Sequence, residues 1–218
     1  MKRCRRIHIE LMLVLAAVIL EVGGCIGLAK GPPEKHYYAL EVTRASESPA
    51  PNAGTILKIR KLRISPPFEG TEIVYRTGEA RYQSDFYNEW FIAPSAMLTQ
   101  QLQTWLTHAR LFHHVVDTSS SLEARYLLEG VVNALYGDFR LNGSPKAVLN
   151  MQVVVIRDRP AREEIVFRRE YQEQVDVGDP SPDALIGGWN HALRRSLMTL
   201  EEDLRKADLN TGDLRHGH

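Results

Sequence analysis

The stretch that decides the fold is YLLEGVVNALYGDF (126–139), followed by KAVLNMQVVVI (146–156). Asn142-Gly143 lies between the two segments, and this dipeptide favours tight hairpin turns, so the segments are predicted to pair as antiparallel strands. A second reversal at 158–161 (DRPA) leads into a return strand at 164–175, where polar and apolar residues are interleaved. The centre of the chain is therefore predicted to form two successive hairpins.

Two long amphipathic helices are predicted on either side of these hairpins in the sequence. From Pro94 to Ala109, apolar residues recur at helical spacing, and proline is tolerated in a first turn because its missing N–H has no helical partner there. Ser181-Pro182-Asp183 supplies an N-cap, a first-turn proline and a first-turn acid in order. The stripe of this second helix consists of Leu185, Trp189, Leu193, Leu197, Leu200 and Leu204. Trp189, and Trp105 in the first helix, are expected in the core.

The remaining strands are predicted to be short. They lie at 36–42, 55–64, 72–75, 80–86 and 111–116. In 55–64 (TILKIRKLRI) the apolar–basic alternation slips once, which indicates a bulge. Thr77-Gly78-Glu79 supplies the turn of a further hairpin. The order of strands, helix, strands and helix predicts an α/β single domain, with a mixed, largely antiparallel sheet and two long helices packed on one face.

The composition is that of a soluble globular protein, with 218 residues, 44% hydrophobic and 25% charged. The 27 basic and 27 acidic residues cancel, so there is no broad basic face for the phosphates of nucleic acid, and nucleic-acid binding is excluded. The domain is predicted to cover 35–208. The polar tail at 209–218 is expected to be disordered.

The N-terminus has the pattern of a secretory signal peptide. Basic residues precede an apolar run from Leu11 to Leu20, about half the length of a membrane-spanning helix. Val22-Gly23-Gly24-Cys25 then resembles a lipobox, the pattern recognised in bacterial lipoprotein processing. We therefore expect residues 1–24 to be removed, palmitate and other acyl chains to be attached to Cys25, and 25–34 to form a tether.

Two alternatives to lipidation stay open, because Glu21 and Val22 depart from the commonest lipobox. They are an ordinary cleaved signal peptide and an uncleaved anchor, with Cys25 a free thiol in either case. If Cys25 is acylated, Ile26 at the next position permits transfer to the outer membrane in bacteria that sort lipoproteins by this residue. The predicted location is the periplasmic face of the outer membrane of a Gram-negative bacterium.

No catalytic, cofactor-binding or metal motif is found in the sequence. His108, His113 and His114 come nearest to a ligand cluster, but neighbouring strand residues point to opposite faces, which disfavours joint binding of one ion by His113 and His114. A periplasmic hydrolase would need a constellation of distant residues such as His36 and Asp85. The chain is thus predicted not to be an enzyme and to hold no cofactor or metal.

Two surface features have both a functional and a structural interpretation. An arginine cluster could form a patch for lipid headgroups or an acidic partner, or a solvated hairpin with local ion pairs. Trp90-Phe91-Ile92 could be an exposed docking surface, or could staple the entry of the first helix to the core. The arginines are Arg157, Arg159, Arg162, Arg168 and Arg169.

Several motifs together resemble the family of ABC-type transport auxiliary lipoproteins, the outer-membrane partners of MCE and paraquat-inducible-type lipid transport systems. They are Cys25 with the nearby HYYAL (36–40), LRISPPFEG (62–70), EIVYRTGEARYQSDFYNEWFIAP (72–94) and LTQQLQTWL (98–106). The resemblance covers nearly all of the predicted domain. Cys25, as the lipidated residue, is the one functional residue that carries over.

The resemblance implies a non-catalytic docking or assembly role in intermembrane lipid transport. The implied partners are an MCE-domain periplasmic protein, an ABC/permease complex and the outer membrane itself, reached through the lipid anchor. A homo-oligomer is compatible with the sequence, which leaves the oligomeric state open. The alternative is an interaction lipoprotein for envelope assembly or cell-wall synthesis.

Overall fold

The structure is a computed structural model that describes residues 34–44, 55–140, 144–158, 162–207 and 209. The described part from Lys35 onward belongs to one compact unit. Within these ranges, no helix has the length and apolarity needed to cross a bilayer. The predicted leader, Cys25, nearly all of the tether and the Asn142-Gly143 turn lie outside the described residues.

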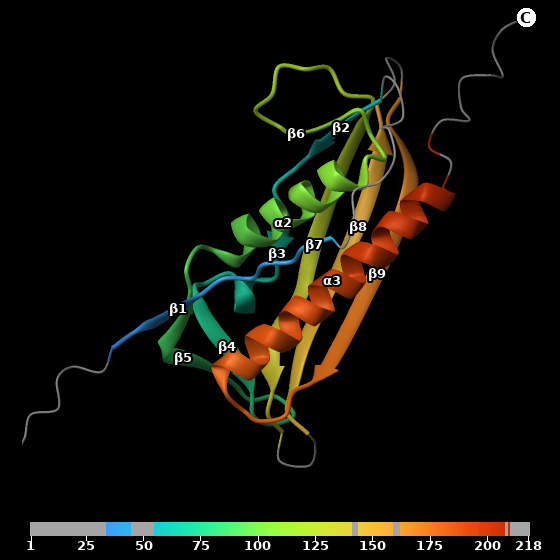
Figure 1. Ribbon diagram of the computed structural model, residues 1–218. Coiled ribbons are helices and arrows are strands. Elements are labelled where there is room, and N and C mark those ends of the chain that lie inside the picture. The colour runs from blue at the N-terminus through green and yellow to red at the C-terminus, as the bar shows by residue number, and fades with distance from the viewer. Residues whose placement is uncertain (1–33, 45–54, 141–143, 159–161, 208, 210–218) are drawn as a thin grey trace, which may run out of the picture. The chain divides into compact units, whose positions relative to one another are not determined.

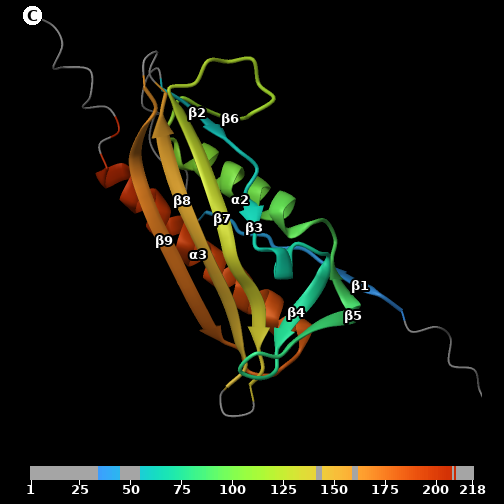
Figure 2. The same ribbon diagram turned by 180° about the vertical axis from the view of Figure 1, so that it is seen from behind.

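The three longest strands of the sheet form the predicted pair of hairpins; they are β7 (Tyr126–Asp138), β8 (Lys146–Arg157) and β9 (Glu164–Asp176) (Figures 1 and 2). All pairing among these strands is antiparallel, from Tyr126 opposite Arg157 to Asp138 opposite Lys146. The register shifts between Val132 and Ala134, and this bulge changes which alternate residues of β7 face the core. The structure thus confirms both hairpins.

Three short strands lie one after another along the other edge of β7, each parallel to it. They are β2 (Ile56–Ile59), β3 (Arg63–Ile64) and β4 (Glu72–Arg76). Beyond them, β6 (His114–Asp117) is parallel to β2, β5 (Tyr82–Trp90) is antiparallel to β4, and β1 (His36–Tyr38) is parallel to β5. The sheet is mixed, and its longest ladders are antiparallel, as the sequence predicts.

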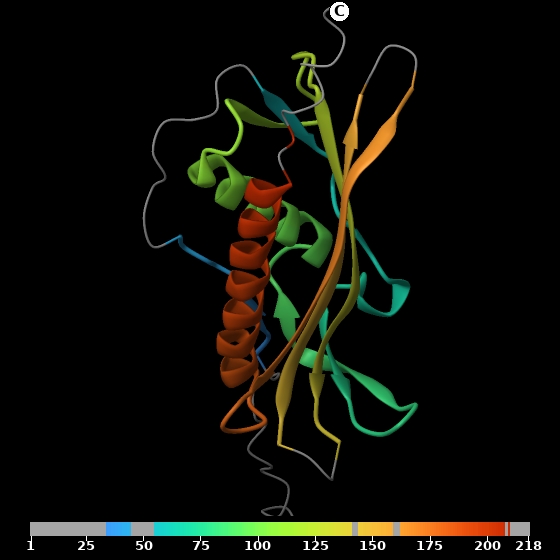
Figure 3. The ribbon, with the colours of Figure 1, turned by 90° about the vertical axis from the view of Figure 1, so that its right-hand side faces the viewer.

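The two long helices cover one face of this sheet (Figure 3). They are α2 (Pro94–Ala109) and α3 (Pro182–Lys206), and both begin where the sequence places them. Ser181 caps α3, since its Oγ accepts a hydrogen bond from the amide of Ala184 at 3.2 Å. The short 3₁₀ helix η2 (Pro66–Phe68) adds an aromatic contact to the sheet, because Phe68 stacks on Tyr136 of β7 at 5.8 Å between ring centroids.

The predicted strand at 36–42 is wrong beyond Tyr38, because the next amides bond to helix side chains instead of a neighbouring strand. The amide of Leu40 donates to Met97 Sδ, that of Val42 to Gln101 Oε1, and that of Glu41 to Asn190 Oδ1. Every buried amide needs an acceptor, so these contacts hold the segment against α2 and α3 without β pairing. Helix side chains thus replace the strand ladder.

Two other predicted strands differ from those observed. The segment 55–64 is divided into β2 and β3, and the amide of Leu62 at the break donates to Thr99 Oγ1 of α2 at 2.9 Å. The strand predicted at 111–116 begins only at His114. The amide of His113 instead donates to the carbonyl of Thr55 just before β2.

The folded part extends one residue beyond the predicted boundary at 208. Leu209 is buried, and its carbonyl accepts hydrogen bonds from the hydroxyl of Tyr126 and from Arg157 Nη2. Placing Leu209 in a disordered tail was therefore wrong, because it closes the end of the core beside β7 and β8. Residues 210–218 lie outside the described residues.

Helix α3 approaches the sheet closely at Gly188. A Cβ atom built there would lie 2.7 Å from both Ala147 Cβ and Val177 Cγ1, closer than packed carbon atoms tolerate. Gly187 is exposed, and apart from its chain neighbours and the nearby backbone of α3, no described atom lies within 4 Å of a Cβ built on it. The two neighbouring glycines therefore allow a matched test of this contact.

We expect Gly188→Ala to lower the free energy of unfolding by about 1–3 kcal/mol, because the added methyl overpacks the contact between helix and sheet. Gly187→Ala should be neutral or should stabilise the protein by up to about 1 kcal/mol, since alanine is the better helix former. Urea unfolding followed by circular dichroism measures both changes. Equal effects of the two substitutions would contradict this packing.

Candidate docking surface

Five exposed apolar side chains gather around β1, β5 and the start of α2, and we call them the aromatic patch. Phe86 and Phe91 are 69% and 71% exposed, whereas most side chains of their size are largely buried in a folded domain. The rings of Phe86 and Tyr87 are in edge contact, 5.1 Å between centroids. The members are Tyr37, Phe86, Tyr87, Phe91 and Ile92.

A bulge in β5 displays Phe86 and Tyr87. The register of β4 with β5 shifts between the pair Glu72–Glu89 and the pair Val74–Ser84, which leaves extra residues in β5. The carboxylate of Asp85 holds this bulge in shape: Oδ1 accepts from the amides of Tyr87 and Asn88 at 2.8 and 3.0 Å.

The second oxygen of Asp85 fixes the bulge to β4. It accepts from the hydroxyl of Tyr75 at 2.6 Å and from Asn88 Nδ2 at 2.8 Å. Burial raises the pKa of Asp85, but these hydrogen bonds outweigh it, so the pKa lies below its ordinary value. Burial, and then the bond to Asp85, raises the pKa of Tyr75. At neutral pH the acceptor is therefore charged and the donor protonated.

Both interpretations that the sequence left open for Trp90-Phe91-Ile92 apply, each to different residues of the segment. Trp90 is buried, with its ring 5.1 Å from that of Trp189 in α3, so it staples the helix entry to the core. Phe91 and Ile92 are exposed and belong to the aromatic patch. The amide of Phe91 donates to the carbonyl of Tyr38 at 2.8 Å, which holds this part of the patch against the end of β1.

Lys35 lies at the border of the aromatic patch. Its ammonium group pairs with Glu89 and lies 5.2 Å from the ring centroid of Phe86. The hydrogen bond to Glu89 raises the pKa of Lys35 above its ordinary value. The patch therefore carries a neutralised ion pair at its edge, not a strong charge of one sign.

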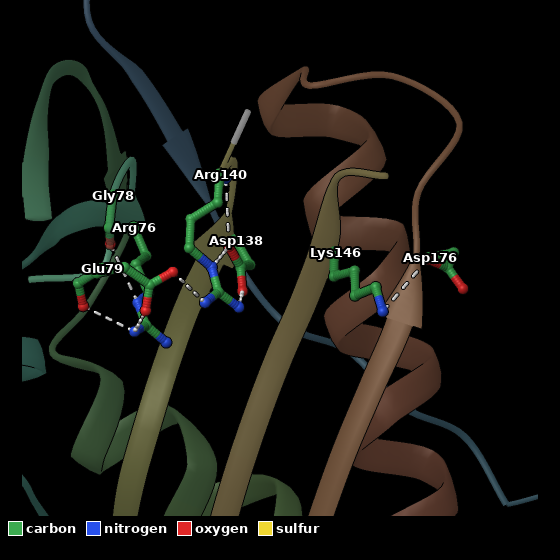
Figure 4. A network of polar contacts seen from close by, with 7 residues as sticks. All are labelled: Arg76, Gly78, Glu79, Asp138, Arg140, Lys146 and Asp176. Atoms are coloured by element: carbon green, nitrogen blue, oxygen red, sulfur yellow. Dashed lines mark hydrogen bonds and ion pairs between the residues drawn. The ribbon is translucent and has the colours of Figure 1, made fainter. Parts of the chain in front are cut away.

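A polar cluster fastens the turn between β4 and β5 to the end of β7 (Figure 4). Arg140 donates to both oxygens of Asp138, at 2.9 and 2.8 Å, and to Glu79 Oε1 at 3.2 Å. Arg76 donates to the carbonyl of Glu79. Burial raises the pKa of Asp138, but the bonds from Arg140 outweigh it and leave the pKa below its ordinary value. These charged groups bond to one another, so we assign the cluster a structural role.

The predicted arginine cluster does not form one exposed patch. Arg157 is buried, with Nη1 3.6 Å from Glu164 Oε2 and its guanidinium 5.7 Å from the ring centroid of Tyr126. Arg169 lies at the limit of an ion pair with Asp203, at 4.0 Å. Arg162 and Arg168 are exposed, and Arg159 lies outside the described residues. Because Arg157 is buried, it cannot belong to an exposed patch for lipid headgroups.

The histidines are arranged differently from the sequence prediction. The rings of His113 and His114 lie 4.3 Å apart between centroids, so the expectation that they point to opposite faces was wrong. The reason is that His113 precedes β6 and is not held in strand alternation. Among the described residues, no group of three or more His, Cys, Asp or Glu side chains could hold a metal ion. His108 is exposed in the last turn of α2.

An open, polar depression lies at the start of β7. Its volume is about 790 Å³. Lys58, Arg60 and Arg125 line it together with Glu123, Asp158 and Glu163, so its lining carries both cations and anions. Such mixed charge gives it no preference for a ligand of one sign.

A family model described as the ABC-type transport auxiliary lipoprotein component matches residues 38–199. The chain belongs to this family. The match begins at the last residue of β1 and ends within α3, so it includes β2 to β9, the whole of α2 and most of α3, and it confirms the resemblance seen in the sequence. Membership assigns the chain to ABC-type transport as an auxiliary component located in the bacterial envelope.

Two solved structures resemble the auxiliary lipoprotein in fold. A Xanthomonas campestris protein of the DUF330 family has a TM-score of 0.64 at 17% identity, with 76% of this chain and 92% of its own covered. A second, uncharacterised protein has a TM-score of 0.61 at 14% identity, with 78% and 99% covered. These likenesses show the α/β fold alone. A search of curated protein sequences found no match.

The sequence drew attention to Phe91 and Ile92 but not to the rest of the aromatic patch. A signal for Phe86 and Tyr87 was nonetheless present, since two adjacent aromatic residues in a strand cannot both face the same core. Tyr37 was assigned to a strand without regard to its face. Cys25, the one site residue taken from the family resemblance, lies outside the described residues.

Proposed function

We propose that this auxiliary lipoprotein is a non-catalytic docking component of an ABC-type/MCE system that moves lipid between membranes. In this proposal residues 1–24 are removed, Cys25 is acylated, and residues 25–34 tether the domain to the periplasmic face of the outer membrane. The observation that carries the proposal is the family match over 38–199, almost the whole described domain. The lipobox-like Val22-Gly23-Gly24-Cys25 supports the anchor.

The structure supports a docking role through the aromatic patch. An exposed apolar surface marks a site of contact with a protein or a membrane. Here the surface is held rigid by Asp85 and by the buried Trp90, so little conformational entropy is lost when a membrane or a protein covers it. The proposed partners are an MCE-domain periplasmic protein and the ABC/permease complex, with phospholipid or another hydrophobic molecule as the cargo.

The test is affinity purification of the full chain, tagged at the C-terminus, from detergent-solubilised envelope. MCE-domain and permease subunits are expected to co-purify with the native chain, and Cys25→Ser should reduce their recovery by removing the protein from the membrane. Reproducible recovery of cell-wall synthases alone would refute the transport role. That result would favour the alternative role in envelope assembly.

A further inference from the structure

We propose that the aromatic patch rests on the surface of the phospholipid bilayer that holds the acylated Cys25. The proposal rests on the anchoring part of the proposed function and is independent of which transport subunits bind. It assigns the exposed rings of Tyr37, Phe86 and Phe91 to the region between headgroups and acyl chains.

The length of the tether brings the patch close to the membrane. Lys35 is the tenth residue after Cys25, and a chain of that length spans at most about 35 Å. Tyr37 follows two residues later, in β1 itself. A surface beside the attachment point of a short tether meets the bilayer at a high effective concentration, so weak contacts suffice to hold it there.

The chemistry of the patch matches the membrane interface. Aromatic rings with polar edges, such as Tyr37 and Tyr87, are typical of the headgroup level, where one end is apolar and the other hydrated. The ammonium group of Lys35 lies 5.2 Å from the ring centroid of Phe86, and a side chain of this length can keep its charge at the hydrated border of the patch. Because Glu89 neutralises this charge, the contact should not require anionic lipid.

Hydrogen bonds fix the backbone beneath the patch, so its side chains cannot turn into the core. The bulge is closed by Asp85, and Phe91 is fixed to Tyr38 by a backbone hydrogen bond of 2.8 Å. Behind it, Trp90 and Trp189 fill the interior. The exposed rings are therefore a stable feature of the folded domain, and one that membrane contact would remove from water.

The test uses the full-length acylated protein reconstituted in phosphatidylcholine vesicles that contain a nitroxide-labelled phospholipid. A fluorophore is attached at Tyr37→Cys, and in the mature chain the thiol of Cys25 is blocked by its thioether. The matched control is Ile165→Cys, because Ile165 is 60% exposed and lies in β9 opposite Ile156, near the far end of the β7–β9 hairpins. We expect strong quenching of the label at position 37 and little at position 165.

A second variant separates membrane contact by the patch from simple nearness to the tether. Phe86→Ser combined with Phe91→Ser in the Tyr37→Cys chain leaves the tether intact, and we expect loss of most of the quenching. Both serines replace exposed side chains, so the domain should stay folded. Circular dichroism of the labelled proteins checks this directly.

Three results would overturn the inference. The first is a protein that floats with the vesicles while its label at position 37 is quenched no more than the label at 165. The second is a label at 37 that is shielded from lipid and shows energy transfer between copies, which would make the patch a protein interface. The third is a protein that does not float with the vesicles, because that result would also contradict an anchor at Cys25. Failure to recover MCE subunits in the affinity purification would leave the inference standing.

Discussion

Replacing Trp189 by alanine is expected to lower the free energy of unfolding by about 3–5 kcal/mol, the usual cost of removing a large aromatic side chain from a core. Trp189 is 1% exposed, and its ring lies 5.1 Å from that of Trp90. Its indole N–H donates to the carbonyl of Val148 at 3.1 Å. The substitution therefore leaves a cavity between α3 and the sheet and a buried carbonyl without its donor.

Met198→Ala is the matched control for this prediction. Met198 lies in α3, nine residues further along, and is 49% exposed. Its truncation should change the free energy of unfolding by no more than about 0.5 kcal/mol. Urea unfolding of both variants gives the comparison, and a Trp189→Ala protein as stable as Met198→Ala would disprove the packing described for α3.

Glu201→Gln is expected to destabilise the domain by about 3 kcal/mol, because it removes the negative charge that faces the largely buried Arg44. Arg44 holds Glu201 through two bonds of 2.9 Å, and the indole of Trp105 donates to the same carboxylate at 3.0 Å. Glu201 therefore joins the segment after β1 to both long helices. Glutamine keeps the shape but cannot supply the negative charge.

Glu202→Gln, one residue away, is the control for charge alone. Its carboxylate is exposed and lies 3.9 Å from Lys206, an ion pair of the kind that contributes little to stability. Equal destabilisation by the two glutamine variants in urea unfolding would contradict the role assigned to Glu201. The expected result is a large loss for Glu201→Gln and almost none for Glu202→Gln.

The carboxylate of Glu201 also leads us to predict that the stability of the domain depends on pH. Burial raises the pKa of Glu201, but the bonds from Arg44, Arg205 and Trp105 outweigh it, so the folded pKa lies below the ordinary value. A lowered pKa contributes stability that is present above the unfolded pKa, about 4.3, and is lost as the pH falls through the folded pKa. Unfolding curves between pH 7 and pH 3 should therefore show a smaller acid loss for Glu201→Gln than for the native chain.

Local signals in the sequence made the hairpins and helices predictable. Ser181 and Pro182 mark the start of α3, and Pro94 marks that of α2, because caps and first-turn prolines act within a few residues. The hairpins from β7 to β9 follow from short turns between long apolar segments. In each case the partners that decide the structure are near each other in the chain.

The rest of the fold depends on contacts between distant residues. No turn signal indicates that β2, β3 and β4 lie parallel along β7, since parallel pairs are joined by long connections. Glu201 looked like one more polar residue of α3, and its partner Arg44 is 157 residues away. The aromatic patch depends on the bulge at Asp85, where the strand pattern fails locally.

The most direct test of the central claim is the intact mass of the mature protein purified from membranes. The account predicts a chain that begins at Cys25 and carries the added mass of its acyl chains, and a Cys25→Ser chain without that mass. A membrane form with a bare thiol at its new N-terminus, or with residues 1–24 still attached, would contradict the lipid anchor and the docking role that depends on it.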